Sequence, residues 1–189
     1  MPKIVRASLA DMSSLLKCFR RVDAYLLSLG LDMWDHGYPD EEDFAAEREA
    51  GRLYVFKDGS RVIGACAISF DVAEAFFPES HSQRKAVALL EDINYQGEDT
   101  VILHHFFIDP AYMGKGLGRT FLQAIHANYK GASFLLSVYP PNTNAQAFFT
   151  ALGYTRYPNE YEFEFGPYSK QIFMAKTFKK EGLCRNIQW

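Results

Sequence analysis

Apolar and polar residues alternate with two periodicities along this chain, one typical of helices and one of strands, and these predict most of its elements. Between Ser8 and Gly30, apolar residues recur every three or four positions, the spacing of one helix face. They are Met12, Leu15, Leu16, Phe19, Val22 and Leu26. Asp11 follows Ser8 by three positions, as in a capping box, and Gly30 is suited to end the helix. A short strand over 4–6 precedes this helix, and a polar helix over 41–50 follows it.

The later segments are typical of strands joined to helices by short turns. Residues 53–57 and 61–70 flank Asp58-Gly59, which is a strong hairpin signal. We also expect strands over 101–108 and 134–139, helices over 117–129 and 142–152, and a closing hairpin of 154–165 with 171–178. Residues 71–99 fit a long loop, or a loop with a helical piece over 86–90. This order predicts one α/β domain over 1–178 with a mixed sheet, followed by a C-terminal tail over 179–189.

Composition is that of an ordinary globular domain and excludes several classes of function. Of the 189 residues, 48% are hydrophobic, which is ample for the core of one domain. The formal net charge of −3 gives no electrostatic reason to expect a nucleic-acid partner. Three widely spaced cysteines form neither a metal-ligand pair nor a disulfide framework, and we expect no metal. The chain starts without a signal-peptide pattern and has no run near the ~20 apolar residues that cross a bilayer, so we expect a cytoplasmic protein without a membrane partner.

The segment with the clearest chemistry runs from Leu103 to Gly118 and has the sequence LHHFFIDPAYMGKGLG. Its apolar beginning ends at Asp109-Pro110, and three glycines at alternate positions then open a helical pattern. A helix start presents N–H groups and the positive end of the helix dipole, and both favour phosphate. Glycines let the backbone approach such a ligand closely because they lack a Cβ atom. The segment therefore predicts a phosphate-binding loop between a strand and a helix.

Two common phosphate motifs do not fit this loop. A P-loop needs Gly-Lys followed by Ser or Thr at the helix start, and this chain has Gly116-Leu117 there. A dinucleotide-binding fingerprint needs a glycine three residues after Gly116, and Arg119 stands at that position. A nucleotide-binding interaction module is therefore the weakest of the functional hypotheses.

Two motifs resemble those of the GNAT superfamily of acetyl-CoA-dependent N-acetyltransferases. The first is the strand and Asp109-Pro110 followed by MGKGLG, similar to the family's Gln/Arg-x-x-Gly-x-Gly/Ala loop, with Met113 in place of Gln or Arg. The second is NTNAQAFFTALGY over 142–154, similar to the family's Asn-x-x-Ala-x-x-Phe/Leu-Tyr-x-x-x-Gly-Phe segment, with Phe149 where many members have Tyr. The segment WDHGYP over 34–39 also resembles one uncharacterised bacterial subgroup, which identifies no substrate.

The resemblance covers about residues 3–178 and implies both a fold and a donor. The implied fold is a single domain whose mostly antiparallel sheet of about six or seven strands has splayed central strands and flanking helices. The implied donor is acetyl-CoA, with its pantetheine arm on a strand edge and its pyrophosphate on the glycine loop. The residues implied to bind it are Phe106, Phe107, Ile108, Met113, Gly114, Lys115, Gly116, Leu117, Gly118, Arg119, Asn142, Asn144 and Phe148. Asn142 and Asn144 can instead cap the following helix, and for Asn142 the cap is the favoured single role. The oligomeric state stays open, although members commonly form homodimers.

The implied activity is acetyl transfer to a primary amine by direct attack in a ternary complex. Such an amine has a pKa of ~10.4 and is protonated at neutral pH, so a base or a water chain must remove a proton. His104 is the first candidate base because alternation places it on one strand face with Phe106 and Ile108. His105 then faces the opposite way, against a helix. The alternative for His104 is a bond to a neighbouring backbone group.

A proton donor for the leaving thiolate is less clearly marked. Phe149 cannot donate a proton, so Tyr154, Tyr139 and solvent are the candidates, with Tyr154 taken as the catalytic residue. The leading alternative function is a catalytically inactive acyl-CoA-binding sensor or regulatory domain, which the departures at Met113 and Phe149 keep open.

The amine acceptor, a small molecule or a peptide, is expected near the aromatic loop over 31–40. The candidate acceptor-binding residues are Trp34, Tyr38, Phe70 and Glu74. Packing is the simpler role for Tyr38, because aromatic residues in such loops commonly just pack, whereas Trp34 is left open.

Overall fold

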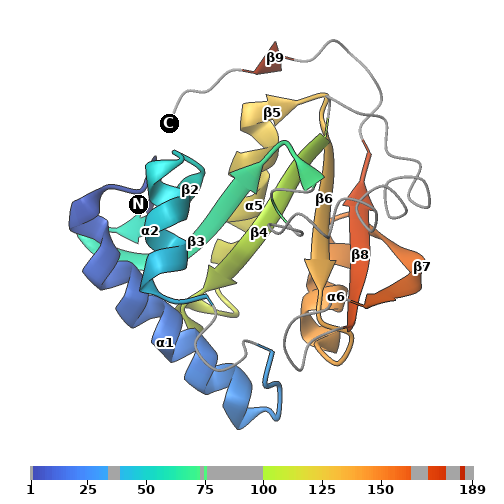
Figure 1. Ribbon diagram of the computed structural model, residues 1–189, viewed down its shortest axis with the longest axis horizontal. Coiled ribbons are helices and arrows are strands. Elements are labelled where there is room, and N and C mark those ends of the chain that lie inside the picture. Colours follow the sequence, from blue (N-terminus) through green and yellow to red (C-terminus); the bar gives the residue numbers. More distant parts are fainter. Residues whose placement is uncertain are drawn as a thin grey trace. The chain divides into compact units, whose positions relative to one another are not determined.

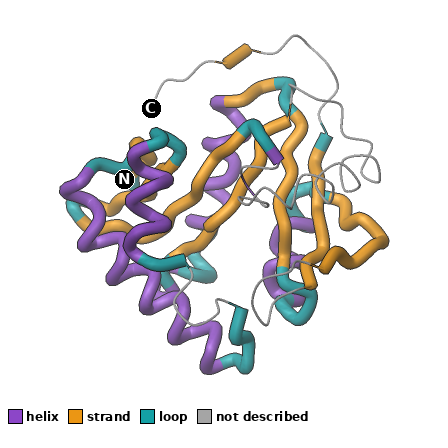
Figure 2. Tube along the Cα trace, viewed as in Figure 1, coloured by secondary structure: helices purple, strands orange, loops and turns teal. Residues whose placement is uncertain are grey.

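The computed structural model describes residues 2–33, 39–72, 75, 100–162, 170–177 and 184–185. The α-helices of this part of the chain, labelled in Figure 1, are α1 (Met12–Ser28), α2 (Glu41–Glu49), α5 (Leu117–Asn128) and α6 (Thr143–Thr150). Two short 3-10 helices are η1 (Leu9–Asp11) and η4 (Pro110–Tyr112). The strands, orange in Figure 2, are β1 (Lys3–Arg6), β2 (Leu53–Asp58), β3 (Arg61–Ser69), β4 (Thr100–Ile108), β5 (Tyr129–Lys130), β6 (Ser133–Val138), β7 (Thr155–Glu162), β8 (Lys170–Lys176) and β9 (Cys184–Arg185).

Seven of these strands form one mixed sheet with the order β1-β2-β3-β4-β6-β8-β7. β4 and β6 run parallel, whereas the pairs β1–β2, β2–β3, β6–β8 and β7–β8 are antiparallel. The registered pairs of β4 with β6 run from Thr100–Ser133 to Leu103–Leu136, and β4 continues to Ile108. The expected mixed α/β class with a mostly antiparallel sheet is therefore confirmed.

Two compact units share the chain. The first unit consists mainly of Met1–Ala67 and His105–Asn128, and the second of Ile68–His104 and Tyr129–Asn186. Each unit is thus assembled from segments that are separated in the sequence. Because the first unit contains the predicted phosphate loop and the second contains α6, the two family-like motifs belong to different units.

Helices cover both faces of the strands in the first unit (Figure 1). On one face, α1 and α2 pack on β2, β3 and Phe107 of β4 through an apolar cluster. Its larger members are Met12, Leu15, Phe19, Val22, Leu26, Phe44, Leu53, Val55, Val62 and Phe107. On the opposite face, Phe121 of α5 stacks on Phe56 of β2 and on Phe106 of β4, with ring centroids 5.1 and 5.4 Å apart. Successive residues of β2 and β4 therefore serve opposite faces, as strand geometry requires.

The second unit has its core on β6 and β8. The buried residues of these strands are Phe134, Leu135, Leu136, Val138, Ile172, Phe173 and Met174. α6 starts where the Asn142 side chain accepts a hydrogen bond from the Ala145 N–H at 3.0 Å, which is the predicted helix cap. The chain leaves α6 through Gly153, whose φ of 87° permits a tight turn. Tyr154 then packs edge-on against Phe149, with 5.4 Å between ring centroids.

The predicted elements agree with the structure to within a few residues, with one addition in the tail. Cys184–Arg185 forms the short strand β9, which pairs with Tyr129–Lys130 of β5. The predicted helix over 117–129 ends one residue earlier, at Asn128, because Tyr129 belongs to β5. Pairing between such short and distant segments leaves no period in either of them.

Several predictions fall outside the described residues. They are the turn of the closing hairpin, most of 71–99 and the centre of the aromatic loop over 31–40. In the part of the chain that the structure describes, no helix has the length and apolarity to cross a membrane.

Candidate functional site

The predicted phosphate loop connects η4 to the first turn of α5. Gly114 and Gly116 have φ angles of 71° and 76°, in the left-handed region that glycine adopts without strain. Apart from chain neighbours, no heavy atom lies within 4 Å of where a Cβ atom of either glycine would stand. Thr120 donates the backbone hydrogen bond to Gly116 at 3.0 Å, so the N–H groups of 117–119 belong to the first helical turn, which has no acceptors within the helix. The loop therefore presents backbone donors on an open side, as an anion requires.

Asp109 fixes the start of this loop. Its carboxylate is fully buried and accepts a hydrogen bond from the Ala111 N–H at 3.1 Å, which caps η4. Its other oxygen accepts hydrogen bonds from Arg21 of α1 and from Arg61 of β3. Burial raises the pKa of this carboxyl. The hydrogen bonds from Arg21, Ala111 and Arg61 lower it by more than burial raises it, so the pKa lies below its ordinary value of 3.8. Asp109 is therefore an anion that neighbouring donors hold in place.

Two cations lie over the ring of Tyr112, the last residue of η4. The guanidinium of Arg61 is 5.6 Å from the ring centroid and the ammonium of Lys115 is 5.3 Å from it. Lys115 also donates a hydrogen bond to the Ala111 carbonyl at 2.8 Å. The predicted donor-binding Lys115 is thus folded onto its own loop, whereas Arg119 is exposed on the first turn of α5.

Strand β4 has an unusual backbone conformation at its centre. His105 has a φ of 50°, a left-handed value that is uncommon for a residue with a Cβ atom. Such a residue interrupts regular pairing in the way of a β-bulge. Beyond it, Phe106 faces α5, Phe107 packs on Phe19 of α1, and a Cβ atom at Gly64 of β3 would stand 2.7 Å from the Phe107 carbonyl oxygen. The predicted pantetheine edge over 106–108 therefore follows a local distortion of the strand.

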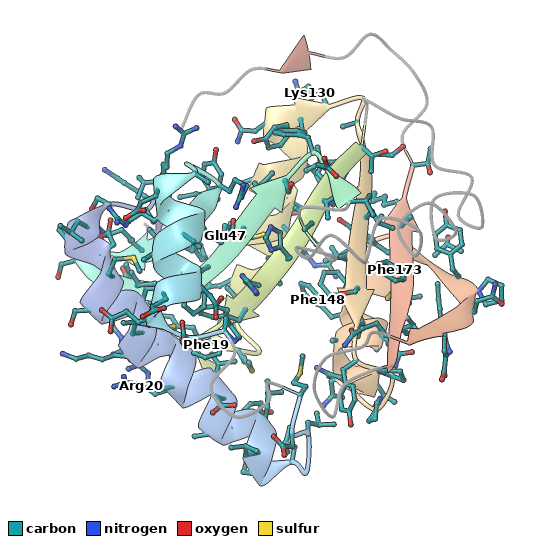
Figure 3. The ribbon with its side chains drawn as sticks, viewed as in Figure 1. Phe19, Arg20, Glu47, Lys130, Phe148 and Phe173 are labelled. Carbon is teal, nitrogen blue, oxygen red and sulfur yellow. The ribbon has the colours of Figure 1, made fainter. Side chains whose placement is uncertain are left out.

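The His105 ring faces α2, which confirms the prediction that it lies against a helix. Its centroid is 5.6 Å from that of Phe44, in an edge-on arrangement. Burial lowers the pKa of His105 below 6.5, while Glu47 and Asp43 partly offset this shift. Figure 3 labels Glu47 of α2 and Phe19 of α1, the two helices that cover this face. The His105 ring is therefore neutral at neutral pH.

The remaining described candidates belong to the second unit. His104, the predicted base, is half-buried in β4, and Tyr154 is only 2% exposed. Asn144 is exposed on α6, and Phe148 is half-buried with its ring edge-on to Phe149 at 5.1 Å. Phe70 is 42% exposed and lies edge-on to Tyr129 at 5.8 Å. The other acceptor-site candidates, Trp34, Tyr38 and Glu74, lie outside the described residues.

A comparison with profiles of protein families identifies the family of this chain. The profile of the acetyltransferase (GNAT) family matches residues 15–154, which include the glycine loop, the distorted strand β4 and the segment capped by Asn142. The chain belongs to the GNAT acetyltransferase family. The resemblance seen in the two sequence motifs is thereby confirmed, although Met113 and Phe149 differ from the usual residues.

Solved structures of GNAT proteins share the fold across almost the whole chain. An acetyltransferase of the GNAT family from Streptococcus agalactiae has a TM-score of 0.74 at 19% identity, covering 95% of this chain and 96% of its own. A putative acetyltransferase from Salmonella typhimurium, solved with its cofactor acetyl-CoA, has a TM-score of 0.60 at 17% identity and covers 96% of both chains. The ribosomal-protein-S18-alanine N-acetyltransferase from Escherichia coli has a TM-score of 0.58 at 18% identity and covers 100% of both. None of the curated proteins compared with the chain matches it.

Sequence reasoning missed Arg21 and Arg61 in this GNAT chain. Neither residue stands in a motif, and they lie 88 and 48 positions from Asp109, so no local pattern joins the three. Within the described residues, no group of three His, Cys, Asp or Glu side chains is arranged to hold a metal ion. Cys18 and Cys66 are buried, and burial raises the pKa of the Cys18 thiol to about 12, so these two thiols are core residues.

Proposed function

We propose that this GNAT protein is an N-acetyltransferase that transfers the acetyl group of acetyl-CoA to a primary amine. The observation that carries the proposal is the glycine loop, which opens onto the first turn of α5 directly after the distorted part of β4. An anion and an extended amide chain can bind side by side on these two features. The Salmonella typhimurium protein, whose title names acetyl-CoA as its cofactor, supports the same donor for this chain.

The two ends of the first-unit site suit the two parts of the donor. Backbone N–H groups over 114–119 would donate to the pyrophosphate, with Lys115 and Arg119 adding positive charge near it. Main-chain groups over 106–108 would pair with the amides of the pantetheine arm, because β4 continues beyond its last registered pair with β6, at Leu103, and His105 in between has a positive φ. We further propose that Asn142, Asn144 and Phe148 contact the donor, as the family motif predicts.

His104 is the proposed general base. The amine nitrogen attacks the thioester carbonyl carbon, a C–N bond forms as the C–S bond breaks, and the sulfur leaves with the electron pair. His104 takes the proton that the amine nitrogen loses, directly or through water. A backbone N–H of the distorted strand would stabilise the negative charge on the carbonyl oxygen during the attack.

Tyr154 is the proposed proton donor to the departing sulfur, with solvent as the alternative. A thiol pKa of ~8.5 makes the thiolate a fair leaving group, so the reaction does not depend strongly on an acid. Phe149 supports this view because it fills the usual tyrosine position with a buried ring that packs on Tyr154.

The proposed acceptor is an amine of a small molecule or a peptide. The Escherichia coli protein is named for acetylating an alanine of ribosomal protein S18, which supports a peptide amine as one acceptor class. Phe70 offers an exposed aromatic surface for such an acceptor, and we propose that Trp34, Tyr38 and Glu74 contribute to the same site.

Two measurements test the proposal in sequence. Acetyl-CoA at saturating concentration should raise the melting temperature of the protein, because a ligand that binds only the folded state stabilises it. Release of free thiol is then followed with a panel of diamines, amino acids and peptides. Absence of a melting shift would contradict acetyl-CoA binding, whereas a shift without thiol release for any amine would support the inactive sensor instead.

A further inference from the structure

The buried Asp109 carboxylate has more partners than a helix cap needs. One oxygen, Oδ1, accepts from the Ala111 N–H and completes the cap of η4. The other oxygen, Oδ2, accepts from Arg21 Nε at 3.0 Å, from Arg21 Nη2 at 2.6 Å and from Arg61 Nη2 at 3.0 Å. We call these three residues, Arg21, Arg61 and Asp109, the Asp109 clamp. The clamp therefore joins α1, β3 and the end of β4 at one oxygen atom.

Stability alone does not account for the clamp, because burying a charge costs desolvation free energy. The Asp109 side chain is 1% exposed, whereas the side chains of Arg21 and Arg61 are 40% and 49% exposed. A neutral side chain with one acceptor oxygen would cap η4 without the cost of desolvating a carboxylate. The second oxygen, Oδ2, fixes the orientation of the Asp109 side chain. It accepts hydrogen bonds from three N–H donors on two elements, and these also hold the backbone of Asp109 in place.

The same network continues along the loop. Arg61 lies over the ring of Tyr112, and the Tyr112 hydroxyl is 3.5 Å from Asp58, the last residue of β2. Lys115 covers the same ring and donates to the Ala111 carbonyl. Side chains thus hold the loop from Asp109 to Lys115, directly before the left-handed Gly116. No heavy atom apart from chain neighbours lies within 4 Å of where a Cβ atom of Gly114 or Gly116 would stand, so side-chain packing against these glycines does not hold the loop.

We propose that Arg21 and Arg61 are positioning residues that hold the glycine loop, through Asp109, in the conformation that binds the pyrophosphate of the donor. The inference rests on the proposed function, because it takes acetyl-CoA as the ligand of the loop. A loop held in its binding conformation loses less conformational entropy when the ligand arrives, and binds more tightly for that reason. Loss of the clamp therefore weakens the binding of acetyl donors whose pyrophosphate contacts the loop. It leaves the binding of donors without a pyrophosphate unchanged.

Asp109→Asn separates positioning from charge attraction. The variant keeps an acceptor oxygen for the Ala111 N–H but removes a negative charge from the vicinity of an anionic ligand. Charge attraction alone would strengthen acetyl-CoA binding in this variant, whereas positioning weakens it. We expect the Kd for acetyl-CoA, measured by calorimetry, to rise roughly tenfold.

Arg21→Gln and Arg61→Gln should each raise the Kd for acetyl-CoA as well. Arg21→Lys should recover only part of the affinity, because an ammonium cannot reproduce the paired N–H donors of the guanidinium. Arg20→Gln is the matched control, since Arg20 is the exposed neighbour on α1 that Figure 3 labels. It removes the same charge and should leave the Kd unchanged.

The decisive comparison uses a donor that lacks the pyrophosphate and the nucleotide. In the clamp variants kcat/KM should fall for acetyl-CoA but not for S-acetylpantetheine, and kcat at saturating acetyl-CoA should be retained. Wild-type affinity in Asp109→Asn and Arg21→Gln, full recovery in Arg21→Lys, or an equal loss for both donors would overturn the inference. Failure of the wild-type protein itself to bind acetyl-CoA would instead overturn the proposed function, and the inference with it.

Discussion

The imidazole of His105 packs edge-on against the ring of Phe44, with 5.6 Å between the ring centroids. It does so from a backbone with a φ of 50°, where residues with a Cβ atom are strained. A strained residue in the middle of a buried strand persists only when its surroundings hold it there, and such residues are concentrated at functional sites. His105 is followed immediately by the strand segment proposed to bind the pantetheine arm.

His105→Gly should therefore be more stable than His105→Ala. Both variants lose the contact with Phe44, but glycine adopts a positive φ without the cost of about 1–2 kcal/mol that alanine meets there. Urea unfolding of the two variants at neutral pH measures the difference directly. Equal free energies of unfolding would show that the backbone at this position carries no strain.

The His105 ring should make stability depend on pH in the weakly acidic range. Burial holds its pKa below 6.5 in the folded protein, against the opposing effect of Glu47 and Asp43 on α2. The unfolded chain therefore binds the proton more readily, and the stability that the neutral ring contributes is present above pH 6.5 and is lost as the pH falls through the lower pKa of the folded state. Asp109 does not interfere, since its pKa lies below 3.8.

His105→Gln should flatten this dependence. The free energy of unfolding is compared at pH 7.5 and pH 5.5 for the wild type, for His105→Gln and for His126→Gln, a variant of the half-buried histidine near the end of α5. The wild type and His126→Gln should lose more stability on acidification than His105→Gln does. The same loss in all three proteins would contradict the assignment.

His104→Ala should slow acetyl transfer without weakening the donor complex. Removal of a general base typically costs about 10²-fold or more in rate, and the deficit should be largest near neutral pH, where the amine is protonated. Thiol release measured across pH 6–9, together with the Kd for acetyl-CoA, separates the two effects. An unchanged pH profile would exclude His104 as the base.

Gly114→Ala and Gly116→Ala should weaken acetyl-CoA binding as well as destabilise the loop. Both sites have room for a methyl group, so the cost is the positive φ, about 1 kcal/mol for each substitution. Gly59→Ala is the matched control, because Gly59 has a φ of 60° and equally open surroundings in the β2–β3 turn. All three variants should lose similar stability, but only the two loop variants should show a higher Kd. A higher Kd in Gly59→Ala as well would trace the effect to general destabilisation.

Local patterns in the sequence predict the parts of this fold that are themselves local. The apolar face of α1 is buried as its spacing predicts, and Asn142 caps α6 as its place at the start of the predicted helix over 142–152 indicates. The Asp58-Gly59 hairpin forms for the same reason, since its turn chemistry is contained in neighbouring residues.

The features that could not be predicted depend on distant partners. The Asp109 clamp joins residues from three segments, and any of the chain's arginines fits such a role equally well on sequence grounds. The sequence around His105 does not indicate its left-handed backbone conformation, which sequence analysis usually infers from glycine or asparagine. In this protein the surrounding packing holds the residue in that conformation. Family motifs indicated the loop and the strand, but not the side chains that hold them.

The stacked rings of Phe56, Phe121 and Phe106 also have a consequence for how the protein is made. Phe56 belongs to the second strand of the chain, whereas Phe106 and Phe121 are synthesised after a long intervening segment that belongs to the other unit. During translation, β1 to β3 with α1 and α2 therefore leave the ribosome with one apolar sheet face uncovered, and that face stays open until α5 has emerged. The glycine loop is completed at the same moment, so the backbone donors proposed to bind the pyrophosphate form only when the exposed sheet face is finally covered.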